Sequence, residues 1–130
     1  MGDRFKTHGD FSWCELMTND VDASKGFYSK VLGWTIDEMP MAEGEPYNVI
    51  KVGGQGVGGI MKMPKEVPPG VPPHWQSYVT VDDVDAVAKK AEELGATAIV
   101  PPTDIPNVGR FYVFKDPQGA VLALIQYKQT

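Results

Sequence analysis

Residues 13–35 read WCELMTNDVDASKGFYSKVLGWT, and residues 75–97 read WQSYVTVDDVDAVAKKAEELGAT. Six residues of the first stretch recur in the second at a constant separation of 62 positions, without a gap. One offset across a strand and the helix after it indicates two copies of one supersecondary unit. We therefore expect matched residues of the two copies to mark a functional site. The recurring pairs are Trp13/Trp75, Thr18/Thr80, Asp20/Asp82, Leu32/Leu94, Gly33/Gly95 and Thr35/Thr97.

The bulk properties predict one domain over residues 1–130, because a chain of this length has no room for two independent cores. A net charge of −5 without a basic stripe argues against a nucleic-acid partner. The single Cys14 excludes an intrachain disulfide and favours a reducing compartment, so we expect a cytoplasmic protein. No run of about 18 apolar residues is present, and we expect no contact with a membrane.

The first copy spans about residues 11–63 and predicts one strand, one helix and three more strands. Residues 11–18 read as the first strand, Asp20 as the helix N-cap and Gly33 as the residue that ends the helix. The remaining strands are expected at 34–38, 47–52 and 57–62, the last one after a glycine-rich turn.

A proline-rich linker over about residues 64–73 precedes the second copy, which spans about 74–127. The linker should be stiff and extended. In the second copy we expect a strand over 75–81 and a helix capped by Asp82 or Asp83 and ended by Gly95. Further strands are expected at 97–100, 110–115 and 120–127. The linker prolines are Pro64, Pro68, Pro69, Pro72 and Pro73.

Each copy is therefore a βαβββ module whose helix covers one face of its sheet. The predicted fold is α+β, with two tandem βαβββ modules that form a cupped mixed sheet around a cleft. Exposed strand edges give a physical reason for two chains to pair, and we expect a homodimer.

This arrangement resembles the vicinal-oxygen-chelate superfamily, which includes glyoxalase I, extradiol dioxygenases and bleomycin-resistance proteins. The resemblance covers about residues 11–127. It implies the fold more strongly than any one activity, since many reactions share this scaffold. The motifs that carry it are LMTND at 16–20, FYSKVLGW at 27–34, DDVD at 82–85, LG at 94–95 and DPQG at 116–119.

Metal-dependent members of that superfamily bind their ion through His and Glu side chains on the strands. The resemblance maps those positions onto Trp13, Trp75, Ala123 and either Ile60 or Met61, none of which can bind a divalent ion. A shift of one residue would bring in His74 or Gln76 but not the remaining ligands. The sequence is more similar to a metal-free, glyoxalase-like branch, so we expect no metal and no cofactor.

Trp13 and Trp75 are the first candidate site residues. Strand alternation places Trp13 with Glu15 and Met17, and Trp75 with Ser77 and Val79, on equivalent faces. If those faces line the cleft, the two indoles form an aromatic clamp for a flat or cationic ligand. Alternatively, they fill a site that has lost its function.

Glu15 and Arg110 are the candidate charged groups. A carboxylate beside two indoles would be poorly solvated and can act as a general base. The other interpretation is a structural acid paired with an arginine or a lysine, for which Arg110 is one candidate partner. Arg110 itself either binds a carboxylate or phosphate of the ligand through its planar guanidinium, or lies at the surface and closes a turn.

The remaining candidates carry weaker signals. We expect Met61, Ser77 and Tyr112 to contribute to the ligand-binding wall. Cys14 is expected in the core. The two imidazoles, His8 and His74, are too far apart in sequence to indicate a metal site. The glycine-rich stretch 54–59 has the letters of a dinucleotide fingerprint, but no helix follows it to receive a pyrophosphate.

Three functions remain open from the sequence. The first is metal-independent capture of a small, partly aromatic or anionic molecule. The second is a metal-free isomerase, lyase or hydroxylase-type enzyme that uses Glu15 as its base. The third is a metal-dependent lyase or dioxygenase whose ligands the mapping has misplaced.

Overall fold

The computed structural model describes residues 2–41, 44–65, 67 and 69–128, so Pro68 of the predicted linker lies outside the described residues. The chain divides into two units. Residues 13–76 form one of them, called the α1 unit after its helix. Residues 1–12 and 77–130 form the other, called the α2 unit.

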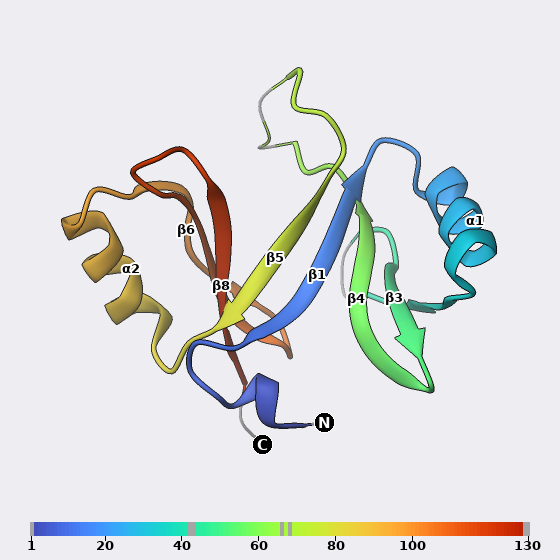
Figure 1. Cartoon of the computed structure of the whole chain (residues 1–130), viewed down its shortest axis with the longest axis horizontal. Coiled ribbons are helices and arrows are strands. Elements are labelled where there is room, and N and C mark those ends of the chain that lie inside the picture. Colours follow the sequence, from blue (N-terminus) through green and yellow to red (C-terminus); the bar gives the residue numbers. More distant parts are fainter. Residues whose placement is uncertain (1, 42–43, 66, 68, 129–130) are drawn as a thin grey trace. The chain divides into compact units, whose positions relative to one another are not determined.

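The α1 unit contains four strands in the order β2-β3-β4-β1, with α1 lying beside them (Figure 1). Strand β1 pairs parallel with β4, and β3 pairs antiparallel with both β2 and β4. Gly53 (φ 59°) and Gly54 (φ 79°) form the turn between β3 and β4, where two positive φ angles favour glycine. The elements are β1 (Phe11–Thr18, in this unit from residue 13), α1 (Val21–Leu32), β2 (Thr35–Met39), β3 (Tyr47–Val52) and β4 (Gln55–Lys62).

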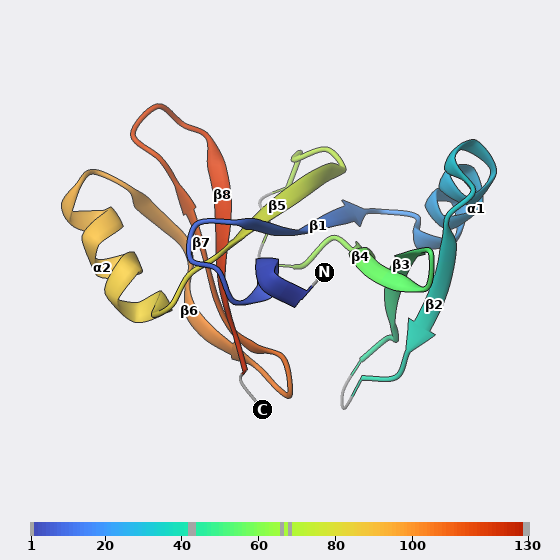
Figure 2. The same cartoon turned by 60° about the horizontal axis from the view of Figure 1, so that its bottom comes forward.

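The α2 unit has the order β5-β8-β7-β6, and α2 lies beside β6 and β8 in Figure 1 and beside β6 and β7 in Figure 2. Strand β5 pairs parallel with β8, and β7 pairs antiparallel with β8 and β6. The predicted α+β class and the two βαβββ units are confirmed. The elements are a short 3₁₀ helix η1 (Gly2–Phe5), β5 (His74–Thr80, in this unit from residue 77), α2 (Val84–Glu93), β6 (Thr97–Ile105), β7 (Gly109–Lys115) and β8 (Val121–Tyr127).

The helix N-caps show that the spacing between the two copies differs from the 62 residues predicted from the sequence. The Asp20 carboxylate accepts a hydrogen bond from the Ala23 amide at 3.0 Å, and that of Asp83 accepts from the Ala86 amide at 3.2 Å. The cap of α2 is therefore Asp83, and Asp82, which the 62-residue offset matched to Asp20, lies outside the helix. At the strand–helix junction the two copies are related by 63 residues.

Each helix packs against one face of its own sheet. Under α1 the core consists of Leu16, Ile50 and Ile60, with exposed fractions of 5%, 1% and 0%. Fully burying one such aliphatic side chain stabilises the fold by about 1.5–3 kcal/mol. The equivalent core under α2 consists of Val81, Val84, Ala88, Tyr112 and Leu124, with Val79 among the partly buried residues packed against it.

Two local predictions are wrong. Strand β6 continues through Pro101 and Pro102 to Ile105, although a loop was expected there. Its pairing with β7 shifts register on both sides of Val100, and β6 is an edge strand, where proline is tolerated. Cys14 is exposed rather than buried in the core. Among the described residues, no helix is both long and apolar enough to cross a membrane.

Candidate functional site

A hydrogen-bonded cluster lies on the face of the α1-unit sheet that α1 does not cover. Leu16 packs beneath α1, so Trp13 and Glu15, at odd positions of β1, lie on the opposite face. The Trp13 indole Nε1 donates to the Tyr47 hydroxyl at 3.0 Å, and that hydroxyl donates to Glu15 Oε2 at 2.6 Å. We call these three residues the Trp13–Tyr47–Glu15 cluster.

Two glycines of β4 make room for this cluster. Strand β4 lies between β1 and β3, and Gly59 is the register partner of both Glu15 and Val49. A Cβ atom at Gly59 would overlap the Tyr47 hydroxyl. At Gly56 a Cβ atom would lie 3.2 Å from Val49 Cγ1 and 3.5 Å from the Trp13 ring. The glycine-rich stretch therefore lets aromatic side chains lie across a strand, and it forms no phosphate-binding loop.

Glu15 is only 7% exposed. A buried carboxylate costs free energy unless hydrogen-bond donors replace the water that it loses. The Tyr47 hydroxyl supplies one such donor at 2.6 Å. Arg110, which the sequence offered as a structural partner of Glu15, donates to two aspartates of the α2 unit.

Trp75 contacts the α1 side of the sheet. Its Nε1 donates to the Tyr28 hydroxyl at 3.4 Å, and its ring packs edge-on against Tyr28 and Trp34 with centroid distances of 5.4 and 5.9 Å. Trp13 lies on the other face of the same unit, so the predicted clamp does not fit these contacts. Side chains alternate along a strand, and a one-residue error in register therefore exchanges the faces.

The corrected register also changes which residue of β5 corresponds to Trp13. That residue is Gln76, which is 5% exposed and alternates with Trp75. Ser77 has the same parity as Trp75 and as Val79, which packs against the α2 core, whereas Gln76 alternates with them. Met61 is the register partner of Met17 and shares the face of Glu15, as expected.

Arg110 is held by an ion-paired network in the α2 unit. Its Nε and Nη2 donate to the two carboxylate oxygens of Asp85, and its Nη1 donates to Asp104, each at 3.0 Å. The hydrogen bonds to Asp85 and then to Asp104 raise the pKa of Arg110. All of these groups are at the surface, which agrees with the structural interpretation of Arg110 and not with a ligand-binding one.

Tyr112 is a core residue of the α2 unit. It is 0% exposed in the α2 core, and its hydroxyl donates to Glu92 Oε2 at 3.0 Å. Burial, and after it the hydrogen bond to Glu92, raises the pKa of Tyr112 to about 12. This burial does not support the ligand-binding role predicted for Tyr112, which stays a prediction.

The two histidines have local partners within their own units. His8 Nδ1 accepts from the Asp82 amide at 3.1 Å, which adds a contact just before the start of α2. His74 Nδ1 lies 2.9 Å from the carbonyl oxygen of Pro72, to which it donates when that nitrogen is protonated. Each imidazole therefore has a backbone group of its own unit as a partner.

The side chains at the expected metal-binding positions do not fit a divalent ion. With the corrected register these residues are Trp13, Met61, Gln76 and Ala123. An indole, a thioether, an amide and a methyl group do not replace the imidazole and carboxylate ligands of zinc, iron or nickel. Over the part of the chain that the structure describes, no cluster of three or more His, Cys, Asp or Glu residues could hold a metal ion.

Comparison with known proteins agrees with this architecture. The sequence profile of the Glyoxalase/Bleomycin resistance protein/Dioxygenase superfamily matches residues 10–124. A protein of Mycobacterium bovis named putative glyoxylase CFP32 is 46% identical over 118 residues, which cover 91% of this chain and 44% of that protein. The anthracycline biosynthesis protein DnrV of Streptomyces peucetius is 31% identical over 124 residues, which cover 87% of this chain and 45% of that protein.

Among solved structures, methylmalonyl-CoA epimerase from Mycobacterium tuberculosis shares the fold. Its TM-score is 0.67 at 17% identity, with 93% of this chain and 89% of that chain covered. The present chain spans less than half the length of the curated relatives described above. The family profile covers most of the chain, and one relative is nearly half identical to it. The chain therefore belongs to the glyoxalase/bleomycin resistance protein/dioxygenase superfamily.

Proposed function

We propose that this chain binds a small, partly aromatic organic molecule, without a metal ion, on the face that carries the Trp13–Tyr47–Glu15 cluster. The observation that supports this proposal is a pair of hydrogen bonds. They fix a half-buried indole, a phenol and a buried carboxylate on a sheet face without a helix. A fixed indole offers a flat apolar surface for an aromatic ring. Glu15 and Tyr47 beside it provide oxygen atoms that can accept a hydrogen bond from the ligand.

The charge of the cluster favours a ligand that donates hydrogen bonds over an anionic one. The anionic alternative depended on Arg110, which is bound to Asp85 and Asp104. Glu15 would repel an anion. A flat molecule that carries a hydroxyl or amino group can stack on the indole and donate a hydrogen bond to the carboxylate. The name of the Streptomyces peucetius relative, which refers to the biosynthesis of anthracyclines, is compatible with a polycyclic aromatic ligand.

The test compares two tryptophan variants. A panel of hydroxylated aromatic compounds is titrated against the full chain and followed by indole fluorescence and melting temperature. We expect Trp13→Phe to lose both responses and the matched control Trp75→Phe to keep the melting-temperature response. If Trp75→Phe abolishes binding while Trp13→Phe leaves it intact, the proposed site is wrong.

A metal-free enzyme is the second candidate, and the 2.6 Å hydrogen bond from Tyr47 to Glu15 favours it. A buried carboxylate in a fixed orientation is suited to accept a proton from a bound substrate, as an isomerase or lyase requires. Glu15→Gln should abolish turnover of any substrate found, with the melting temperature little changed. Full activity in Glu15→Gln would exclude Glu15 as the base.

A metal-dependent lyase or dioxygenase is not supported by the residues at the mapped positions. Elemental analysis of untagged protein tests this point. We expect substoichiometric amounts of zinc, iron, nickel and manganese. One tightly bound ion per chain would contradict the proposal of metal independence.

The homodimer and the cytoplasmic location are also proposals. Helix α1 has no buried residue among its 12 positions, and three of its apolar side chains are more than half exposed: Phe27, Val31 and Leu32. A second copy would cover such a surface. Light scattering of wild type and of Val31→Lys should give a dimer and a monomer, respectively. A single cysteine in the chain, Cys14, fits a reducing compartment.

A further inference from the structure

An ion pair lies on the same sheet face as the proposed aromatic-ligand site. Ile50 packs beneath α1, so its neighbour Lys51 in β3 lies on the opposite face, which no helix covers. The Nζ of Lys51 lies 3.1 Å from Oδ2 of Asp37 in β2. One surface of the α1 unit therefore carries both the proposed ligand site and a charged pair.

The Trp13 indole reaches across β4 toward the strand that carries Lys51. Trp13 belongs to β1, but its Nε1 donates to the Tyr47 hydroxyl of β3 at 3.0 Å. The benzene end of the indole lies beside Gly56 of β4, where a Cβ atom would be 3.5 Å from Cη2. Gly56 is the register partner of Lys51. A ring stacked on this indole would thus extend from Glu15, at the Nε1 end, toward Lys51, at the benzene end.

The two ends of the indole offer opposite hydrogen-bonding chemistry. The carboxylate of Glu15 accepts hydrogen bonds, whereas the ammonium group of Lys51 only donates them. An ammonium group has three N–H donors, and the carboxylate of Asp37 lies beside one side of it. A neutral carbonyl oxygen can therefore accept a further hydrogen bond from Lys51. A carboxylate is less suitable, because Glu15 and Asp37 would both repel it.

We propose that Lys51 determines the class of ligand that the aromatic site accepts and selects flat hydroxyaryl ketones. This inference rests on the proposed function and adds one requirement to it. The hydroxyl group of the ligand donates to Glu15, its ring stacks on Trp13, and its ketone oxygen accepts a hydrogen bond from Lys51 Nζ. A phenol without the ketone lacks the last of these three contacts.

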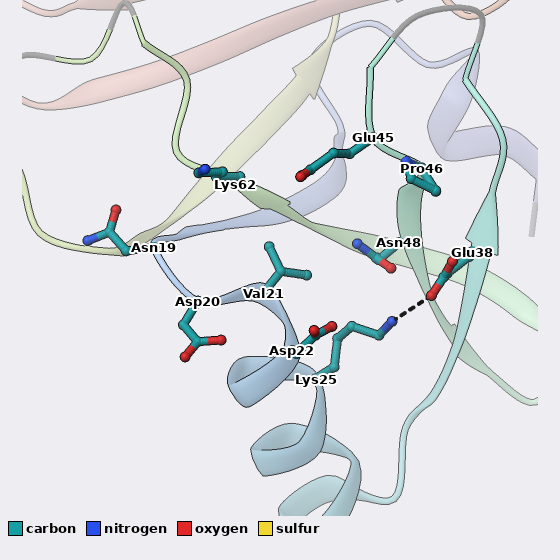
Figure 3. A pocket seen from close by; sticks show the side chains of 10 residues that line it. All are labelled: Asn19, Asp20, Val21, Asp22, Lys25, Glu38, Glu45, Pro46, Asn48 and Lys62. Atoms are coloured by element: carbon teal, nitrogen blue, oxygen red, sulfur yellow. Dashed lines mark hydrogen bonds and ion pairs between the residues drawn. The ribbon is translucent and has the colours of Figure 1, made fainter.

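The opposite face of the same sheet supplies a matched ion pair for comparison. The Nζ of Lys25 in α1 lies 3.1 Å from Oε2 of Glu38 in β2, beside a pocket on the α1 side (Figure 3). Glu38 follows Asp37 in β2, so the two carboxylates point to opposite faces. Each pair joins a lysine to the same edge strand. Of the two lysines, however, only Lys51 shares the face of Trp13.

The test measures the affinities of 2-naphthol and 6-acetyl-2-naphthol for the full chain by calorimetry. We expect the ketone to bind about tenfold more tightly, because it gains one hydrogen bond from a charged donor. Lys51→Met keeps the aliphatic stem and removes the ammonium group, so it should abolish this preference. The matched control Lys25→Met should retain it. Asp37→Asn should retain or increase it, because the ammonium group then loses its competing acceptor.

Four results would overturn the inference. Equal affinities of the two compounds would show that Lys51 does not contact the ketone; if Trp13→Phe still weakens both, the aromatic site stands and this inference alone fails. Loss of the preference in both Lys51→Met and Asp37→Asn would mean that the ion pair acts only by stabilising the strands. Tighter binding of 6-hydroxy-2-naphthoate than of the ketone would assign the site to anions. Absence of binding by either naphthol would contradict the proposed function as well.

Discussion

Each unit contains a tyrosine that donates a hydrogen bond to a glutamate, but the two pairs lie on different sides of their sheets. In the α1 unit Tyr47 bonds to Glu15 on the face without a helix. In the α2 unit Tyr112 bonds to Glu92 of α2, on the helix side. The buried partner is the glutamate in the first pair and the tyrosine in the second. The same kind of hydrogen bond thus orients a buried carboxylate in one unit and a buried phenol in the core of the other.

The largest expected effect comes from filling the space at Gly59 that the Tyr47 side chain occupies. Gly59→Ala places a Cβ atom where the Tyr47 hydroxyl lies, so the phenol must move and both hydrogen bonds of the cluster are lost. We expect the free energy of unfolding to fall by about 3 kcal/mol and ligand quenching to disappear. Urea unfolding and fluorescence titration measure the two effects.

Gly26→Ala is the control for that variant. Gly26 lies within α1, and a Cβ atom there would meet nothing within 4 Å. Alanine at an unstrained helix position should raise stability by about 0.5–1 kcal/mol. If Gly59→Ala behaves like Gly26→Ala, then Tyr47 does not hold the position that the cluster requires.

The second effect concerns the other pair and depends on pH. The pKa of Tyr112 is about 12 in the folded chain, above its ordinary value of 10. The folded state therefore retains a proton that the unfolded state loses. The stabilisation that results from the raised pKa of Tyr112 is complete below pH 10 and is lost as the pH rises from 10 to 12. We expect the loss to be on the order of 2 kcal/mol.

Chemical denaturation of wild type and Tyr112→Phe at pH 9, 10.5 and 12 measures this loss. The phenylalanine variant should show a shallower decline over the same interval, since it has no phenol to ionise at that site. Parallel declines in the two proteins would show that Tyr112 ionises equally easily when folded and unfolded.

A third effect compares removal of the two hydroxyl groups. Tyr47→Phe leaves the buried Glu15 without the 2.6 Å donor, whereas Tyr112→Phe leaves Glu92 exposed to water. Near neutral pH we expect Tyr47→Phe to be more destabilising by about 1 kcal/mol. Urea unfolding of both variants tests the order. The reverse order would mean that the pair in the α2 unit is the more important one for stability.

The sequence was sufficient for the fold because hydrophobic alternation, helix caps and glycine turns are local signals. Asp20, Gly33 and Gly95 have the helix-terminal positions expected of them. The candidate site was harder to predict because it depends on register. Two adjacent aspartates, Asp82 and Asp83, compete as the cap of α2, and the wrong choice moves β5 by one residue. With the correct offset of 63 residues, Gln76 and not Trp75 corresponds to Trp13. The expectation of two matched tryptophans came from the offset of 62.

Tyr47 shows the other limit of sequence reasoning. The parity of an isolated strand does not show which face is covered, so the sequence alone did not assign Tyr47 to the site. The available signal was the glycine-rich stretch of β4, since glycines in a strand interior often mark the close approach of another group. Arg110 was misleading for a related reason. Its partner Asp104 lies in a segment that was expected to be a loop.

The smallest expected effect tests whether Arg110 has a structural role in the α2 unit and takes no part in ligand binding by the α1 unit. Its three hydrogen bonds reach Asp85 and Asp104, whose side chains are 59% and 78% exposed. Exposed ion pairs contribute little, because water solvates the separated charges and salt screens them. Arg110→Gln should therefore shift the melting temperature only slightly, and less at high salt than at low salt. It should leave binding of the aromatic ligand unchanged, because the Arg110 guanidinium is occupied by Asp85 and Asp104 of its own unit. A clear loss of affinity for an uncharged ligand would mean that the arginine leaves its aspartates when the ligand binds, and that the structural assignment of Arg110 is wrong.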